Sequence, residues 1–163
     1  MKLDTFEDLI RHQVQELYAA EKQFAQAQPM MAEATTDPDL RDALEQHVDI
    51  TRGQIERLER VAQMLGVSHT GGNSATAKAL VDEGVRISGI DADPAVRDAA
   101  LIAAAQRIEH FEIAGYGTLR ALAKRVGQNQ AARLVEETLA EERGVDMMLT
   151  EMAEGWINKR AAN

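Results

Sequence analysis

Apolar residues recur every three or four positions through most of the 163-residue chain, which is the spacing of one face of an α-helix. No stretch of the sequence alternates apolar and polar residues as a half-buried strand would. The residue types that dominate, alanine, leucine, glutamate, glutamine and arginine, also favour helices. The pattern therefore predicts an all-α fold built from amphipathic helices.

Signals that start helices divide this pattern into elements. Thr5 and Asp8 resemble a capping box, and the Asp-Pro pairs at 37–38 and 93–94 each combine an N-cap with a proline at the first helical position. We expect the tail from residue 158 to fray. The predicted helices cover about residues 5–34, 38–66, 74–88, 94–126 and 129–156.

The lengths and connections of these helices predict their arrangement. Two pairs of long helices are each joined by a short turn, so each pair should form an antiparallel hairpin. The segment between the pairs, about residues 66–93, contains the short helix and is long enough to recross the bundle. The sequence therefore predicts a single domain over residues 1–163, a ferritin-like four-helix bundle with a short extra helix in the long crossover between helices two and three.

An ionisable residue interrupts the apolar stripe of each long helix, within about five residues of the helix midpoint. Side chains near the midpoints of four bundled helices lie at the same depth whichever way each helix runs, so they can converge. Because taking a carboxylate out of water is costly even after relaxation, the pattern predicts a buried cation that compensates the charge. The residues concerned are Glu21, His47, Glu112 and Glu142.

A second carboxylate on the third long helix extends this predicted site. Glu109 precedes Glu112 by three positions and shares its helix face, so carboxylates from this helix could bridge two metal ions. Glu141, next to Glu142, is a rival ligand. A single inward glutamate more often bonds water, and a lone core histidine such as His47 more often bonds a carbonyl or a carboxylate. The coincidence of several such residues at one depth favours ligands here.

Four further residues are expected to support the ligands. Thr51 and Asp146, each one turn beyond a predicted ligand, are candidates for hydrogen bonds that orient it. Tyr18 and Tyr116 flank the same level. Either tyrosine is expected to orient a ligand or to donate an electron or a proton to a small oxygen species.

Composition limits the chemistry and the partners. With no cysteine in the chain, a metal must be bound by carboxylate and imidazole groups, which suit iron, manganese or zinc. The chain carries 18 lysines and arginines against 27 aspartates and glutamates, and the net charge of −9 disfavours nucleic acid and anionic lipid. No apolar run has the length of a membrane span or the form of a signal peptide, so we expect a cytoplasmic protein with no membrane partner.

Three stretches carry a resemblance to a known family: Leu17–Gln23, Asp93–Leu101 and Arg107–Glu112. They resemble the bacterial ferritin-like stress-protein family typified by YciF, and the resemblance extends over nearly the whole chain. It implies a cytoplasmic four-helix bundle with a short additional helix, commonly dimeric, whose activity is poorly defined. More distantly, the chain is similar to rubrerythrin, whose third helix also carries a Glu-x-x-Glu pair at its di-iron site.

The chain departs from the wider di-iron pattern, which places a histidine three residues after a glutamate on the second and fourth long helices. Here Ile50 and Val145 stand three residues after His47 and Glu142. Histidine ligation is therefore reduced. Two iron ions are the expected cofactor, and manganese or zinc remain alternatives.

These observations lead to two main hypotheses of function. The first is a ferritin-like metalloprotein that binds a carboxylate-bridged di-iron or manganese centre at mid-bundle and reacts with oxygen or peroxide in a stress response, as an oxidase or peroxidase would. The second is a non-catalytic, dimeric helical stress or scaffold protein with a vestigial metal site. Iron storage, a third alternative, needs a cage of many subunits, whereas we expect a homodimer.

Overall fold

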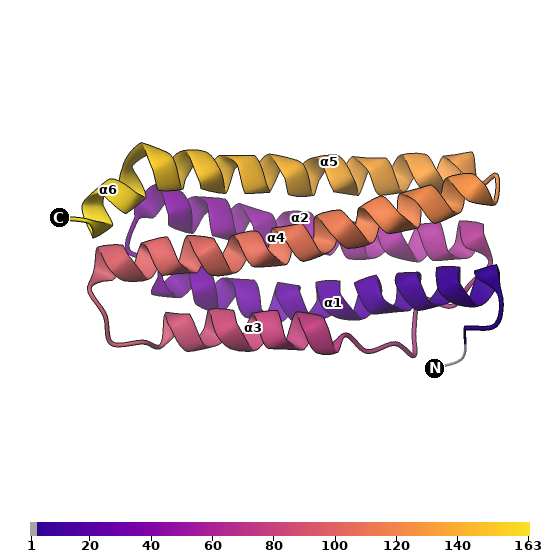
Figure 1. Ribbon diagram of the computed structural model, residues 1–163, viewed down its shortest axis with the longest axis horizontal. Helices are drawn as coiled ribbons and strands as arrows, with labels where there is room; N and C mark the ends of the chain where they lie inside the picture. The colour runs from indigo at the N-terminus through magenta and orange to yellow at the C-terminus, as the bar shows by residue number, and fades with distance from the viewer. Residues whose placement is uncertain (1–2) are drawn as a thin grey trace.

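The structure is a computed structural model that describes residues 3–163, and in this part of the chain it contains helices joined by turns and loops, without strands (Figure 1). The predicted all-α class is confirmed. The helices are α1 (Phe6–Ala34), α2 (Pro38–Leu65), α3 (Ala75–Ser88), α4 (Pro94–Arg125), α5 (Asn129–Met152) and, after a π-helical turn at Ala153–Ile157, α6 (Asn158–Ala161).

Local sequence signals set the helix boundaries much as predicted. The Thr5 hydroxyl accepts the backbone N–H of Asp8 at 3.1 Å, and the Asp8 carboxylate accepts the backbone N–H of Thr5 at 3.0 Å, which completes a capping box before α1. Asp37 caps α2 by accepting the N–H of Leu40 at 3.0 Å. Gly66 ends α2 in the left-handed conformation, with φ of 69°, which glycine adopts without the steric cost of a Cβ.

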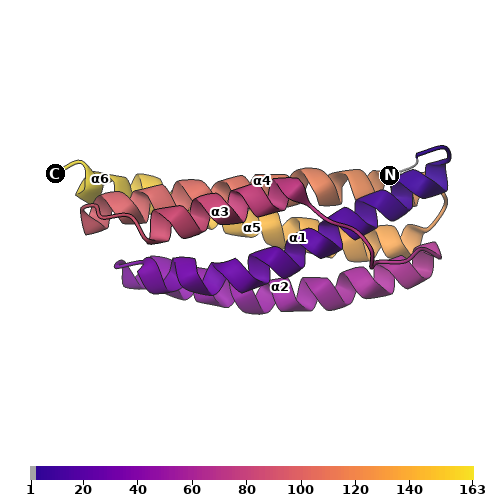
Figure 2. The same cartoon turned by 90° about the horizontal axis from the view of Figure 1, so that it is seen from below.

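The four long helices form a bundle of two antiparallel hairpins, α1–α2 and α4–α5 (Figure 1). Helix α1 packs against α2 and α4, and helix α5 packs against the same two helices, so the four occupy the corners of a square. Helix α3 lies in the crossover and packs on the outside of the bundle against α1 and α4 (Figure 2). The arrangement is the predicted bundle with one long crossover.

The crossover is held against α1 by close contacts. The Gln15 side chain donates to the carbonyl oxygen of Thr70 at 2.6 Å. A Cβ added at Gly72 would lie 2.6 Å from the carbonyl oxygen of Gln15, so only glycine allows this approach. A Cβ added at Gly84 on α3 would lie 2.8 Å from the sulfur of Met31. Small residues therefore let the crossover and α3 lie directly on α1.

The end of the chain is helical and packs against α4, so the expected fraying from residue 158 is wrong. Ile157 is buried within the π-helical turn. The Trp156 indole N–H donates to the Asp37 carboxylate at 3.0 Å, and Arg160 forms an ion pair with the same carboxylate. The residue that caps α2 thus also anchors the C-terminal turn.

The interior consists of two hydrophobic clusters separated by a polar layer. On every long helix, buried polar side chains lie between residues of one cluster and residues of the other. The C-terminal core, at the end of the bundle near the C-terminus (Figure 1), includes Phe24, Leu40, Leu101 and Leu149. The N-terminal core, at the opposite end, includes Val14, Leu58, Leu119 and Leu139.

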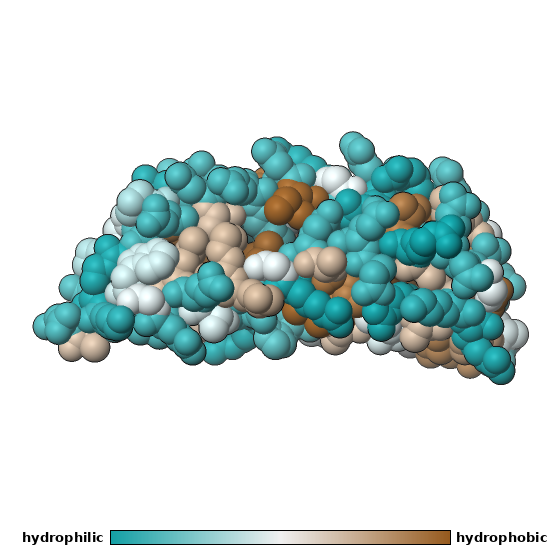
Figure 3. Space-filling view, turned by 90° about the horizontal axis from the view of Figure 1, so that it is seen from above, coloured by the Kyte–Doolittle hydropathy of each residue, from teal (hydrophilic) through white to brown (hydrophobic). Residues whose placement is uncertain are grey.

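The face of the molecule seen in Figure 3 is mostly polar. In the view of Figure 3, hydrophilic residues cover most of the face, and hydrophobic residues appear in small groups between them. The helices therefore turn their apolar faces mainly toward one another. Across residues 3–163, none of the helices combines the length and the apolar character that crossing a membrane requires.

Candidate metal centre

Five ionisable side chains meet in the polar layer, and every long helix contributes at least one. Glu21 comes from α1, His47 from α2, Glu109 and Glu112 from α4, and Glu142 from α5. Each has at most 2% of its surface exposed. The structure thus brings the residues that the sequence selected as candidate ligands into one buried layer.

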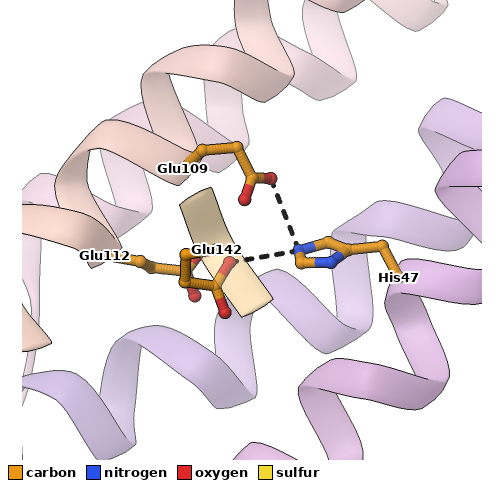
Figure 4. A group of neighbouring side chains, drawn as sticks. All are labelled: His47, Glu109, Glu112 and Glu142. Carbon is orange, nitrogen blue, oxygen red and sulfur yellow. Dashed lines mark ion pairs between the residues drawn. The ribbon is translucent and has the colours of Figure 1, made fainter. Parts of the chain in front are cut away.

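His47 and three glutamates form the tightest group in this layer (Figure 4). The His47 Nε2 atom lies 3.4 Å from Glu109 Oε1 and 3.8 Å from Glu142 Oε2. One potential ligand atom from each of these residues and from Glu112 lies within 4.8 Å of those of the other three. Ligand atoms bound about 2.0–2.2 Å from one cation lie roughly 3–4 Å apart. The four side chains are therefore close to the spacing that one bound ion needs.

Glu21 stands beside this group of four and is held by Tyr116. The buried Tyr116 hydroxyl donates a hydrogen bond to Glu21 Oε1. In addition to burial, the charge of Glu142 raises the pKa of Glu21, so Glu21 is electrostatically coupled to the group of four. Tyr116 therefore contacts a candidate ligand directly.

Burial and crowding of like charges favour the protonated carboxyl groups. Burial, reinforced by the charge of Glu142, raises the pKa of Glu21 to about 8, against the opposing effect of the hydrogen bond from Tyr116. Burial also raises the pKa of Glu142 to about 7 and, with the charge of Glu142, raises the pKa of Glu109 and of Glu112 well above the ordinary value. The metal-free cluster thus retains protons that a cation would displace.

His47 is held in its neutral form by the same environment. Burial lowers the pKa of the imidazole to about 4, because the charged ring would lose its hydration. Among residues 3–163, neither ring nitrogen has a hydrogen-bond partner. A neutral imidazole with a free ring nitrogen is the form that binds metal ions.

Buried polar atoms without a hydrogen-bond partner are concentrated in this layer. In the described part of the chain, ten buried side-chain nitrogen and oxygen atoms lack a partner, and eight of them belong to the five ionisable residues and to Gln54. Each such atom costs about 1–3 kcal/mol, and native proteins contain few of them. A cation would satisfy several at once, so the donor set of carboxylates and imidazole fits a metal site.

Glu142 is supported by a glutamine and an ion pair that the spacing of the sequence does not predict. The buried Gln54 amide donates to Glu141 at 3.0 Å and also to Glu142. Arg57 binds Glu141 through two hydrogen bonds of 2.7 and 2.8 Å, so this rival ligand is engaged outside the group of four. Gln54 follows His47 by seven positions on the same helix face, and a search of that face for neutral polar residues would have found it.

Thr51 and Asp146 lie near the cluster but bond to other groups. The Thr51 hydroxyl donates to the backbone carbonyl of His47 at 3.0 Å, which a threonine on a helix reaches easily one turn back. Asp146 accepts a hydrogen bond of 3.0 Å from Gln106 and lies 3.4 Å from His110 Nε2. Neither residue hydrogen-bonds a candidate ligand side chain, and a role of Thr51 and Asp146 in orienting the ligands stays a prediction.

Tyr18 bonds outside the cluster, which corrects its predicted role. Its hydroxyl donates to Glu59 at 2.8 Å, and its ring packs edge-on against His69 in the crossover, with ring centroids 4.6 Å apart. The apolar stripe of a helix covers an arc of at least about 100°. Residues near the edge of that arc, such as Tyr18, can face a neighbouring loop instead of the bundle centre.

Comparisons with known proteins agree with this architecture. Residues 5–162 match a family model described as a domain of unknown function, DUF892. The whole chain is 40% identical to Protein YciF of Escherichia coli strain K12 and covers 99% of that protein. The crystal structure of the E. coli stress protein YciF matches with a TM-score of 0.92 and 39% identity, over 96% of this chain and 99% of that chain.

Two further solved structures are similar to this chain. YcfI from Rhodopseudomonas palustris, described as a proposed structural protein, has a TM-score of 0.87 and 39% identity, over 91% of this chain and 95% of that chain. A protein from Xanthomonas campestris has a TM-score of 0.76 over 98% of this chain and 100% of that chain. Its identity is 23%, so this last similarity supports the fold alone.

We predict that the metal-free protein loses stability as the pH rises from about 6.5 to about 8. In the folded protein, Glu21 and Glu142 have pKa values of about 8 and about 7. The stability that their protonation contributes is complete below 4.5, their pKa in the unfolded chain, and it is lost as the pH rises through the folded pKa values. His47 acts in the opposite sense, but only below its unfolded pKa of 6.5. Urea unfolding of chelator-treated protein should show a fall of about 1 kcal/mol per pH unit for each retained proton.

The variant Glu21→Gln should make this pH dependence shallower, because it removes one of the retained protons. Glu56→Gln, at an exposed position on α2, is the matched control and should leave the slope unchanged. A free energy of unfolding that is constant or rises over the same pH range would contradict a protonated cluster.

Proposed function

We propose that this chain, which belongs to the YciF-like family with the DUF892 domain, is a cytoplasmic ferritin-like metalloprotein that binds two iron or manganese ions between its four long helices. The match over residues 5–162 confirms the family that the sequence resemblance indicated. Carboxylates would bridge the two ions, and the protein would act on oxygen or peroxide in a stress response. The description of the E. coli relative as a stress protein supports this role.

The observation that carries the proposal is the burial of four glutamates and a histidine whose polar atoms largely lack other partners. Their layer separates two hydrophobic clusters that could otherwise continue through the bundle. Replacing buried charged groups by apolar residues is often neutral or stabilising. Stability alone therefore does not account for this layer, and cation binding is the simplest function that does.

The candidate ligands have distinct roles in this proposal. Glu112 and Glu142 would bridge or chelate the metal ions, and Glu21 and His47 would be terminal ligands. Glu109 would bridge the ions or shift its position when the metal changes oxidation state. The bound metal would supply the redox chemistry, whereas the chain supplies charge balance, a neutral imidazole and a site shielded from water.

A second candidate function is that of a dimeric structural protein with a vestigial metal site. The description of the R. palustris relative as a proposed structural protein favours it. In that case the core carboxyl groups remain protonated, and the outer helix surfaces carry the function. We propose a homodimer under either function, and light scattering separates a dimer from the many-subunit cage that iron storage would need.

For the metalloprotein we predict that metal-free protein takes up two equivalents of ferrous iron per chain and develops a ligand-to-metal absorption band in air. Glu112→Ala should abolish the band, because it removes a carboxylate that belongs to the group of four. Glu112→Gln, which keeps the size of the side chain, should do the same. Elemental analysis gives the stoichiometry, and absorption spectroscopy follows the band.

The exposed Glu56→Gln variant is the control and should behave as the wild type. If the wild-type protein binds no divalent metal under these conditions, the proposed function is refuted.

The two candidates differ in the expected effect of replacing Glu21, Glu112 and Glu142 together by glutamine. For the metalloprotein, we predict that manganese raises the melting temperature of the wild type but not of the triple variant, because a bound ligand stabilises the folded state. In the absence of metal, the melting temperature of the triple variant at pH 8 should be at least as high as that of the wild type. Differential scanning calorimetry measures both effects, and a wild type that gains nothing from metal would favour the structural protein.

A further inference from the structure

The candidate metal centre has two chemically different halves, and the first, the histidine half, contains the imidazole. His47 Nε2 faces Glu109 and Glu142, at 3.4 and 3.8 Å from their nearest oxygens (Figure 4). Within residues 3–163, neither nitrogen of His47 and neither Glu109 Oε2 nor Glu142 Oε2 has a hydrogen-bond partner. A cation could bind these atoms without breaking a hydrogen bond that any of them makes.

The second half, the tyrosine half, is formed by Glu21 and Glu112 and offers oxygen atoms alone, one of which is already engaged. Glu21 Oε1 accepts the hydrogen bond of Tyr116, whereas Glu21 Oε2 and both oxygens of Glu112 have no partner within residues 3–163. Tyr116 is 1% exposed, so its hydroxyl has no access to bulk water. A cation at this half must compete with the tyrosine for Glu21.

We propose that the two metal positions are inequivalent: the histidine half binds the first ion tightly, and the tyrosine half binds a second ion more weakly, with a preference for cations that favour oxygen ligands. This inference rests on the proposed metal binding and adds the order of filling and the class of ion at each position. Imidazole suits zinc and iron, whereas carboxylate oxygens suit manganese. A mixed-metal centre should therefore form when both kinds of ion are present.

The surroundings of the histidine half support the order of filling. The four residues whose ligand atoms lie within 4.8 Å of one another include His47 and Glu142 but not Glu21. Gln54 holds Glu142 from the outside and is itself tied to Glu141, which Arg57 binds. Side chains that are already placed lose less conformational freedom when they bind an ion, so the preassembled half should fill first.

The test uses the full chain, freed of metal with a chelator, and takes Zn²⁺ and Mn²⁺ as probes. One equivalent of Zn²⁺ per chain is added first, and Mn²⁺ is then titrated while electron paramagnetic resonance records the signal of free Mn²⁺. We expect one Mn²⁺ to bind beside the zinc. The protein should release no zinc to a chromophoric chelator during this titration. Zinc alone should bind in two steps whose affinities differ by at least about tenfold.

Two conservative variants separate the positions. His47→Gln should weaken the first zinc step by at least about tenfold and should change Mn²⁺ binding much less. Glu21→Gln should remove the Mn²⁺ ion and should affect the first zinc step much less than His47→Gln does. Glu56→Gln should reproduce both wild-type titrations. The wild-type titration needs no variant, so it decides the question even if a variant fails to fold.

The outcomes distinguish this inference from the proposed function. Two zinc ions that bind with equal affinity, or zinc that manganese displaces, would overturn the inequivalence and leave the proposed metal centre standing. A wild-type protein that binds neither ion would overturn the inference and the proposed function together.

Discussion

The burial of four glutamates and a histidine between two hydrophobic clusters is the constraint on which the rest of this structure depends. Each carboxylate that ionises there loses its hydration and repels its neighbours, so the group must hold protons or a cation. The raised pKa values of the glutamates and the lowered pKa of His47 are two consequences of this one constraint. The concentration of unpaired polar atoms in the layer is a third.

The fold meets this constraint by placing the layer at mid-bundle and closing it on both sides. Two antiparallel hairpins bring the middles of four helices to the same depth, and the hydrophobic clusters above and below exclude water. The crossover lies on the outside of α1 and α4, held by close approaches at Gly72 and Gly84. At the far end, the Asp37 carboxylate joins the start of α2 to Trp156 and Arg160. These contacts fix the helices against one another and therefore fix the positions of the candidate ligands.

Much of the fold and the composition of the layer could be predicted from the sequence, because both depend on local signals. Capping residues and the 3.6-residue period locate helix ends and inward faces, and equal depth along each helix selects the candidate ligands. Side-chain direction within a face is decided by contacts across helices, which spacing does not encode. Tyr18 therefore hydrogen-bonds Glu59 instead of a candidate ligand. Gln54, a neutral residue, hydrogen-bonds Glu142, and the spacing of the sequence does not predict this contact. The bond between Trp156 and Asp37 joins residues 119 positions apart and has no local signal.

The most direct test of the central claim, that a cation balances the buried acids, is anomalous X-ray diffraction from crystals grown with manganese or iron, recorded at the absorption edge of the metal. The account predicts anomalous peaks inside the bundle at coordination distance, about 2.0–2.2 Å for metals of this kind, from oxygens of Glu112 and Glu142. Well-ordered, hydrogen-bonded carboxyl groups with no anomalous peak between them, in crystals that contain the metal, would contradict it.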